Sequence, residues 1–120
     1  MKIANPTAVK GENLATQYLR QHGYKIIERN FRKGYGEIDI VAVCDNTLVF
    51  VEVKTRTSST FGSPLESITP WKLKTLIKTA QYYKLVHPNL PESLRIDALS
   101  VKLAAGEVEN IEHIKNISGF

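Results

Sequence analysis

Hydrophobic residues recur with helical spacing in two stretches of the chain. Thr7 can cap the first helix, which would run to about His22 and stop at Gly23. Thr69-Pro70 combines a capping residue with a proline at the first helical position, which predicts a second helix that runs to about Val86. The expected buried stripes are Ala8, Gly11, Leu14, Ala15, Tyr18 and Leu19 in the first helix, and Leu73, Leu76, Ile77, Ala80 and Tyr83 in the second.

Runs of β-branched and aromatic residues predict four strands and a weaker fifth. The strong strands cover 24–31, 37–44, 48–54 and 94–102, and a turn at 104–107 leads into the weak strand. The polar segment 55–64 is typical of a mobile loop. The order αβββαβ predicts an α/β fold with one mixed sheet flanked by helices, in which the last strong strand runs parallel to an earlier one. The length of 120 residues suits a single domain over 1–120.

Charge is unevenly distributed along the chain. Residues 1–84 carry 13 Lys and Arg against 7 Asp and Glu, whereas residues 85–120 carry 3 against 5. This balance favours a polyanionic partner such as nucleic acid, although a solvated basic surface has the same composition. The single cysteine, Cys44, excludes an intrachain disulfide and a zinc site built from cysteines, and we expect it to pack as a small hydrophobe.

No hydrophobic run approaches the ~20 residues that a membrane-spanning helix needs. The first residues, MKIANPTAVKGEN, also lack the hydrophobic core of a signal peptide. We therefore expect a cytoplasmic protein with no membrane contact.

Four charged residues interrupt the hydrophobic hairpin GEIDIVAVCDNTLVFVEVKTR, which covers residues 36–56. With a tight turn at Asp45-Asn46, Asp39 would lie opposite Glu52, and Glu37 opposite Lys54. Opposed residues have Cβ atoms ~5 Å apart, and two acids at that distance repel each other. Such a pair suits a hard cation, Mg²⁺ or Mn²⁺. A solvent-exposed strand face with a weak surface ion pair is equally compatible with these four residues.

The pattern of Asp39, a spacer and then Glu52-Val53-Lys54 resembles the PD-(D/E)xK nuclease superfamily, although Ile38 stands where that name has proline. The fuller pattern is similar to the YraN family of small bacterial proteins, which are predicted to be nuclease-like and are distantly similar to archaeal Holliday-junction resolvases. The matching segments cover nearly the whole chain in order. They are GENLATQYLRQHGY at 11–24, RNF at 29–31, GEIDIVA at 36–42, LVFVEVKTR at 48–56 and RIDALSV at 95–101.

The resemblance implies a restriction-endonuclease-like αβββαβ core with a metal site. Asp39 and Glu52 would be the metal ligands, helped by the backbone carbonyl of Val53. Lys54 would be the catalytic lysine, which orients or helps to deprotonate the attacking water or neutralises the developing charge. Glu12 would match the first-helix acid of the resolvase-like branch, and it is also compatible with a plain, partly exposed helix acid.

Two functional hypotheses follow. The first is a Mg²⁺- or Mn²⁺-dependent nuclease that hydrolyses phosphodiester bonds in DNA, with branched or flapped DNA as candidate substrates. The second is a nucleic-acid-binding or adaptor module that keeps the nuclease fold without cutting. The oligomeric state stays open under both, a homodimer included.

Further residues could contact nucleic acid or serve the structure. The expected phosphate-binding residues are Arg56, Arg32, Lys33, Lys74 and Lys78, each of which alone is also typical of a solvated surface. Tyr35 and Trp71 could stack on unpaired bases, although packing is the commoner role of such residues. Arg95 and Asp97 alternate along a strand, and we expect them to form a structural pair.

Overall fold

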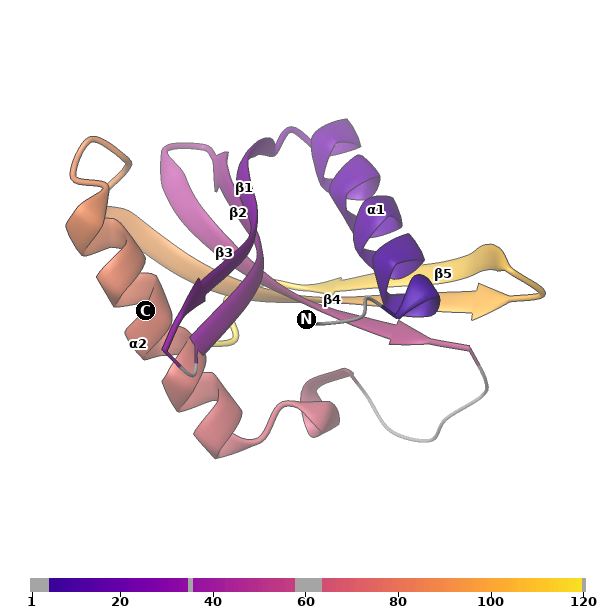
Figure 1. Ribbon diagram of the computed structural model, residues 1–120. Coiled ribbons are helices and arrows are strands. Elements are labelled where there is room, and N and C mark those ends of the chain that lie inside the picture. The colour runs from indigo at the N-terminus through magenta and orange to yellow at the C-terminus, as the bar shows by residue number, and fades with distance from the viewer. Residues whose placement is uncertain (1–4, 35, 58–63, 120) are drawn as a thin grey trace.

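Five strands form one mixed sheet, and a long helix packs against each of its faces (Figure 1). The computed structural model describes residues 5–34, 36–57 and 64–119. Tyr35 and most of the predicted loop at 55–64 lie outside these residues. The elements are α1 (Pro6–Gln21), β1 (Lys25–Lys33), β2 (Gly36–Cys44), β3 (Thr47–Arg56), a short 3₁₀ helix (Pro64–Ser67), α2 (Pro70–Val86), β4 (Ser93–Ala104) and β5 (Glu107–Ile114).

The strands lie in the sheet in their order along the chain, from β1 to β5. β3 and β4 are parallel, and the other neighbours are antiparallel. The long connection between β3 and β4 contains α2, as a parallel pair requires. The predicted αβββαβ order, the mixed sheet and the weak last strand are therefore confirmed.

Each helix begins with a capping side chain followed by proline. Thr69 caps α2 and accepts a hydrogen bond from the backbone N–H of Lys72, as predicted. The prediction of Thr7 as the first cap is wrong, because Asn5 accepts hydrogen bonds from the N–H groups of Thr7 and Ala8. Pro6, which has no N–H to donate, follows that cap. Neither helix of the described ranges is long and hydrophobic enough to cross a bilayer.

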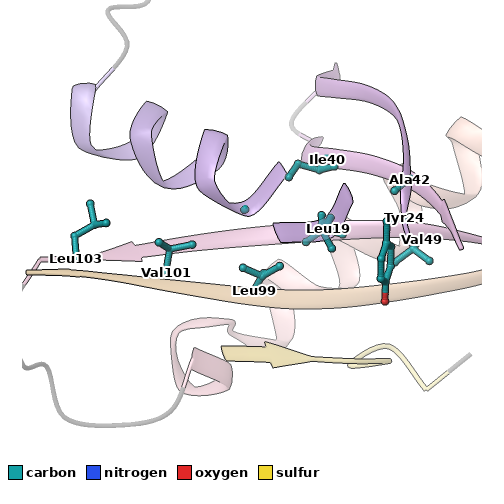
Figure 2. Packing of buried hydrophobic residues seen from close by; sticks show 10 residues of the cluster. Leu19, Tyr24, Ile40, Ala42, Val49, Leu99, Val101 and Leu103 are labelled. Atoms are coloured by element: carbon teal, nitrogen blue, oxygen red, sulfur yellow. The ribbon is translucent and has the colours of Figure 1, made fainter. Parts of the chain in front are cut away.

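The two faces of the sheet bury separate hydrophobic clusters. Figure 2 shows the α1 side, where Leu19 of the helix packs over Val49, Leu99 and other sheet residues. On the opposite side, Leu76, Ala80 and Tyr83 of α2 pack with Phe50 and with other residues of β2, β3 and β4. Removing hydrophobic surface from water in these two clusters supplies the main driving force for the layered fold. The predicted stripes are largely buried, but Ala8 is exposed at the start of α1.

β2 and β3 separate at the end remote from their turn. Their ladder runs from Cys44–Thr47 to Ile40–Val51, which confirms the predicted register near the turn. The pairs Asp39–Glu52 and Glu37–Lys54 were predicted to continue it, and that extension is wrong. Beyond Ile40, β2 keeps its pairing with β1, while β3 keeps its pairing with β4 as far as Arg56. The ends of two strands that follow different neighbours can diverge, and Asp39 lies where they do.

Candidate active site

Asp39 bridges the two strands where they separate. The backbone N–H of Val53 donates a 2.7 Å hydrogen bond to Asp39 Oδ2. Ile38 packs on the α2 side of the sheet, whereas Ile40 packs on the α1 side. Side chains two apart normally share a face, so β2 twists around Asp39. This twist brings the carboxyl group of Asp39 to the edge of β3 and not into the sheet core.

Glu52 is the buried partner of Asp39. Its side chain is only 7% exposed, and its Oε2 lies 3.7 Å from Nζ of Lys72 at the start of α2. Lys72 and Lys54 both lower the pKa of Glu52, but burial outweighs them and the net pKa is raised. The two ammonium groups therefore offset only part of the cost of burying the Glu52 carboxylate.

Asp39 and Glu52 each affect the pKa of the other. Burial and the neighbouring charge of Glu52 raise the pKa of Asp39 to about 7, although the hydrogen bond from Val53 opposes this rise. The charges of Glu12 and Glu37 raise it further. Burial raises the pKa of Glu52 as well, although a hydrogen bond with Asp39 opposes this rise, so a proton taken up here belongs to the pair of carboxyl groups. Near neutral pH, the pair holds one proton in part of the molecules.

Glu12 faces this pair from α1 and is held at one oxygen. Its Oε1 accepts hydrogen bonds from Arg29 Nε at 3.2 Å and from Asn30 Nδ2 at 2.9 Å, and lies 3.1 Å from Arg29 Nη2. Asn30 has a positive φ of 57°, a conformation that asparagine adopts more readily than most residues. Gly11 precedes Glu12, and a Cβ there would overlap the side chain of Thr55. The glycine therefore lets α1 lie close to β3 and brings Glu12 near the site.

A hollow of ≈ 190 Å³ lies between α1 and β3. Glu12, Asp39, Val53 and Lys54 line it, together with Asn5, Thr7, Ala8 and Thr55. Three of the four predicted metal-site residues and the predicted catalytic lysine thus border one space. Glu52 does not line the hollow itself, but its side chain is hydrogen-bonded to Asp39, which does.

The donor atoms around the hollow fit a hard divalent cation. Carboxylate and backbone carbonyl oxygens are the ligands that Mg²⁺ and Mn²⁺ prefer. Burial and mutual repulsion raise the pKa values of Asp39 and Glu52, and a bound cation would offset both effects. Over 5–34, 36–57 and 64–119, no three His, Cys, Asp or Glu side chains form a ready metal cluster. The structure brings two carboxyl groups together and holds Glu12 across the hollow.

The predicted phosphate-binding residues fall into different surroundings. Arg32 pairs with Glu37 across β1 and β2 at 3.2 Å, so Arg32 replaces Lys54 as the cross-strand cation of Glu37. Lys33 lies over the ring of Tyr82, with Nζ 4.9 Å from the ring centre. Lys74 and Lys78 are exposed on α2, and Arg56 is partly buried at the end of β3.

Three residues that contact the acids of the site were not predicted to be functional. Lys72 approaches Glu52 from another layer of the fold, and nothing in its local sequence indicates this contact. Arg29 and Asn30 belong to the RNF segment that carried the family resemblance, and that segment was the signal that could have identified them. Their role depends on contact with α1, which local patterns do not specify.

A second polar cluster lies apart from the hollow and is structural. Asp97 is fully buried and accepts hydrogen bonds from Arg95 Nε at 2.9 Å and from the backbone N–H of Asn116 at 2.9 Å. Nε2 of His113 lies 2.8 Å from it. Arg95 also donates to the hydroxyl group of Tyr24. These contacts link β4 to the residue before β1, to β5 and to the chain after β5, and they include the predicted structural pair of Arg95 and Asp97.

Residues 11–101 match the model of a family described as uncharacterised protein family UPF0102. A UPF0102 protein of Syntrophomonas wolfei is 48% identical over 106 residues, which cover 88% of this chain and 91% of that protein. A UPF0102 protein of Geobacter metallireducens is 47% identical over 107 residues, which cover 89% of this chain and 87% of that protein. Both relatives therefore match over nearly their whole length.

Among solved structures, a repair endonuclease from Pyrococcus abyssi is similar, with a TM-score of 0.48 and 17% sequence identity. The similarity covers 91% of this chain and 42% of that chain. The chain thus spans less than half the length of that protein.

Proposed function

The chain belongs to the uncharacterised protein family UPF0102, and we propose that it is a divalent-metal-dependent nuclease that hydrolyses phosphodiester bonds in DNA. The observation that carries this proposal is the Asp39–Glu52 pair, a half-buried and a buried acid whose pKa values are both raised, beside a hollow that Glu12 and Lys54 also line. Burying charges that repel each other costs stability, and a site arranged for chemistry accounts for that cost.

The residues divide the chemical tasks among them. Asp39, Glu52, the Val53 carbonyl and the Glu12 carboxylate would hold Mg²⁺ or Mn²⁺. When bound, the ion would act as a Lewis acid toward the phosphate oxygens. The ammonium group of Lys54 would donate hydrogen bonds to the attacking water or to a phosphate oxygen, and it would stabilise the negative charge that develops there. Arg29 and Asn30 would keep Glu12 Oε1 fixed, which leaves Oε2 of Glu12 to bind the metal ion.

The basic residues of the first 84 positions would attract the DNA backbone. Lys74 and Lys78 are the exposed candidates on α2, and Arg32, Lys33 and Arg56 are further candidates. Branched or flapped DNA is the substrate class that we propose. Contacts to phosphates alone would not distinguish such structures from duplex DNA, because both present the same phosphate groups.

A second candidate function is a DNA-binding module that does not cut. The contact between Lys72 and Glu52 favours it, since an ammonium group 3.7 Å from that carboxylate competes with a metal ion for the same charge. Cleavage and binding assays separate the two candidates.

The test is incubation of the protein with branched, flapped, single-stranded and duplex DNA in the presence of Mn²⁺. Cleavage that is lost in both Asp39→Asn and Lys54→Ala supports the nuclease, because a contaminating nuclease would remain active in the variant preparations. Binding without cleavage by the wild-type protein would instead support the second candidate. Equal cleavage by wild type and both variants would overturn the site assignment.

A further inference from the structure

Trp71 is a large hydrophobic side chain left in solvent next to the site. It lies in the first turn of α2 and is 68% exposed, whereas tryptophan is usually well buried in folded proteins. The following residue, Lys72, reaches Glu52. Consecutive Cα atoms lie only about 3.8 Å apart, so Trp71 lies on α2 directly beside the residue whose side chain reaches the Asp39–Glu52 pair.

The exposed face of α2 combines this ring with positive charge. Residues three and four apart, or seven apart, lie along one side of a helix, so Trp71, Lys74 and Lys78 share a face. Lys74 and Lys78 are exposed, and the sequence of α2 contains four lysines and no acid. A hydrophobic protein partner would not need this charge, whereas an aromatic ring beside a line of lysines is the arrangement that binds single-stranded nucleic acid.

We propose that Trp71 stacks on an unpaired base of the DNA strand that enters the site, while Lys74 and Lys78 contact the neighbouring phosphates. In an intact duplex, neighbouring base pairs cover the faces of each base, so the indole has nothing to stack on. The substrate class is therefore DNA with unpaired bases beside the bond to be cut, such as a flap or an opened branch. This inference rests on the proposed function, since the Asp39–Glu52 pair defines where that bond lies.

The chain offers a direct optical test, because Trp71 is its only tryptophan. Intrinsic tryptophan fluorescence then reports on one side chain. The metal-free protein, with chelator present to prevent cleavage, is titrated with a single-stranded oligonucleotide, with the matching duplex and with a strand of equal length that carries abasic sites. Fluorescence anisotropy of dye-labelled DNA measures binding independently in each titration.

We expect the single strand to quench Trp71 strongly, and the duplex and the abasic strand to bind with little quenching. Stacking of one base contributes ~1–3 kcal/mol, so Trp71→Ala should weaken single-strand binding about fivefold or more, and Trp71→Phe should restore part of it. Leu85→Ala is the matched control, because Leu85 is the most exposed of the large hydrophobic residues of α2, at 75%. It should leave binding unchanged.

Three results would overturn the inference. They are binding of the single strand without quenching, equal quenching by the abasic strand, and a fluorescence change that depends on protein concentration alone, which would indicate self-association through Trp71. Cleavage of the same oligonucleotides with Mn²⁺ is measured separately. Cleavage that requires Asp39, without quenching at Trp71, would leave the proposed function standing and remove only the stacking role.

Discussion

The backbone N–H of Val53 donates to Asp39 Oδ2 just beyond the last paired residues of β2 and β3. This hydrogen bond favours the ionised carboxylate, yet burial and the charge of Glu52 raise the Asp39 pKa to about 7. The protein thus fixes the position of a carboxyl group whose charge it does not fully neutralise. A bound cation would neutralise the remaining negative charge of this carboxyl group.

Asp39→Asn should stabilise the metal-free protein at neutral pH by about 1 kcal/mol, the scale of a cross-strand pair effect. The amide oxygen can still accept the hydrogen bond from Val53, while the repulsion with Glu52 is removed. Wild type should gain stability on addition of Mn²⁺, and the variant should bind Mn²⁺ at least tenfold more weakly. Chemical denaturation and calorimetric titration measure these effects, and Asp45→Asn in the hairpin turn is the matched control. Destabilisation of the apo variant by more than ~1 kcal/mol would show that the Asp39 charge is structural.

The stability of the metal-free protein should fall between about pH 4 and pH 7. The folded-state pKa of Asp39 is raised, so the folded protein holds this proton more tightly than the unfolded chain does. Its contribution is fully present below the unfolded pKa and is lost as pH rises through about 7, with a slope of up to ~1.4 kcal/mol per pH unit. Mn²⁺ affinity should rise over the same range because the ion displaces the proton. The comparison of wild type with Asp39→Asn isolates this contribution, and identical pH profiles would contradict it.

Asn30→Gly should weaken Mn²⁺ binding about tenfold, the lower end of the effect of losing a group that orients a metal ligand. Glycine keeps the positive φ and the net charge but removes the 2.9 Å hydrogen bond to Glu12. Asn46→Gly is the control, since Asn46 also has a positive φ, of 60°, and lies in the remote turn. Calorimetric titration of both variants measures the effect. Equal affinities would mean that the hydrogen bond from Asn30 does not orient Glu12 for metal binding.

Charge reversal of Lys74 and Lys78 together should flatten the salt dependence of DNA binding. Each phosphate contact contributes about 0.7–0.9 to the slope of log K against log salt, so the slope should fall by roughly 1.4 to 1.8. The control is charge reversal of Lys25 and Lys115, which changes the net charge equally but lies near the hairpin turn. Anisotropy titrations over a range of salt concentrations give both slopes. Equal flattening by the control pair would indicate a general charge effect and no contact at α2.

Asp97→Asn should destabilise the protein by roughly 3–5 kcal/mol, because it leaves the guanidinium group of Arg95 without its fully buried carboxylate partner. Burial alone would raise the pKa of Asp97, but hydrogen bonds from His113 and Arg95 hold it below its usual range. Its stabilising effect is thus present above the unfolded pKa and is lost as pH falls through the folded-state value. Glu92→Gln, which removes a strongly exposed carboxylate that pairs with Lys84, is the control and should change stability by under ~1 kcal/mol. Chemical denaturation measures the stability of both variants. If Asp97→Asn lowered stability as little as Glu92→Gln, the structural role of Asp97 would be refuted.

Local patterns predicted the elements well and the candidate site only in part. The start of α2 and the register beside Asp45-Asn46 depend on neighbouring residues, and both were confirmed. The separation of β2 from β3 depends on their other partners, β1 and β4, which the hairpin sequence does not specify. The pairing of Glu37 with Lys54 was therefore wrong, and Arg32 of β1 takes the place of Lys54.

The site residues also differ in whether the local sequence predicts them. Asp39 and Glu52 could be found because they interrupt a hydrophobic hairpin. Lys72 and Arg29 could not be placed, because each reaches its acid from an element remote in sequence. Contacts between layers follow from packing of the complete fold, and single-sequence patterns contain little information about them.

The separation of β2 from β3 also determines when the site can exist during synthesis. Residues Glu52 to Arg56 follow the end of the ladder with β2, and their partners in the described sheet are 98–102 of β4. Glu52 pairs with Ala98, which the ribosome adds 46 residues later. Until then, the segment that carries Glu52 and Lys54 is an unpaired edge, and closing so long a connection is entropically costly. For the synthesis of these 46 residues, a nascent chain therefore carries Asp39 and Glu52 without the strand that pairs with Glu52.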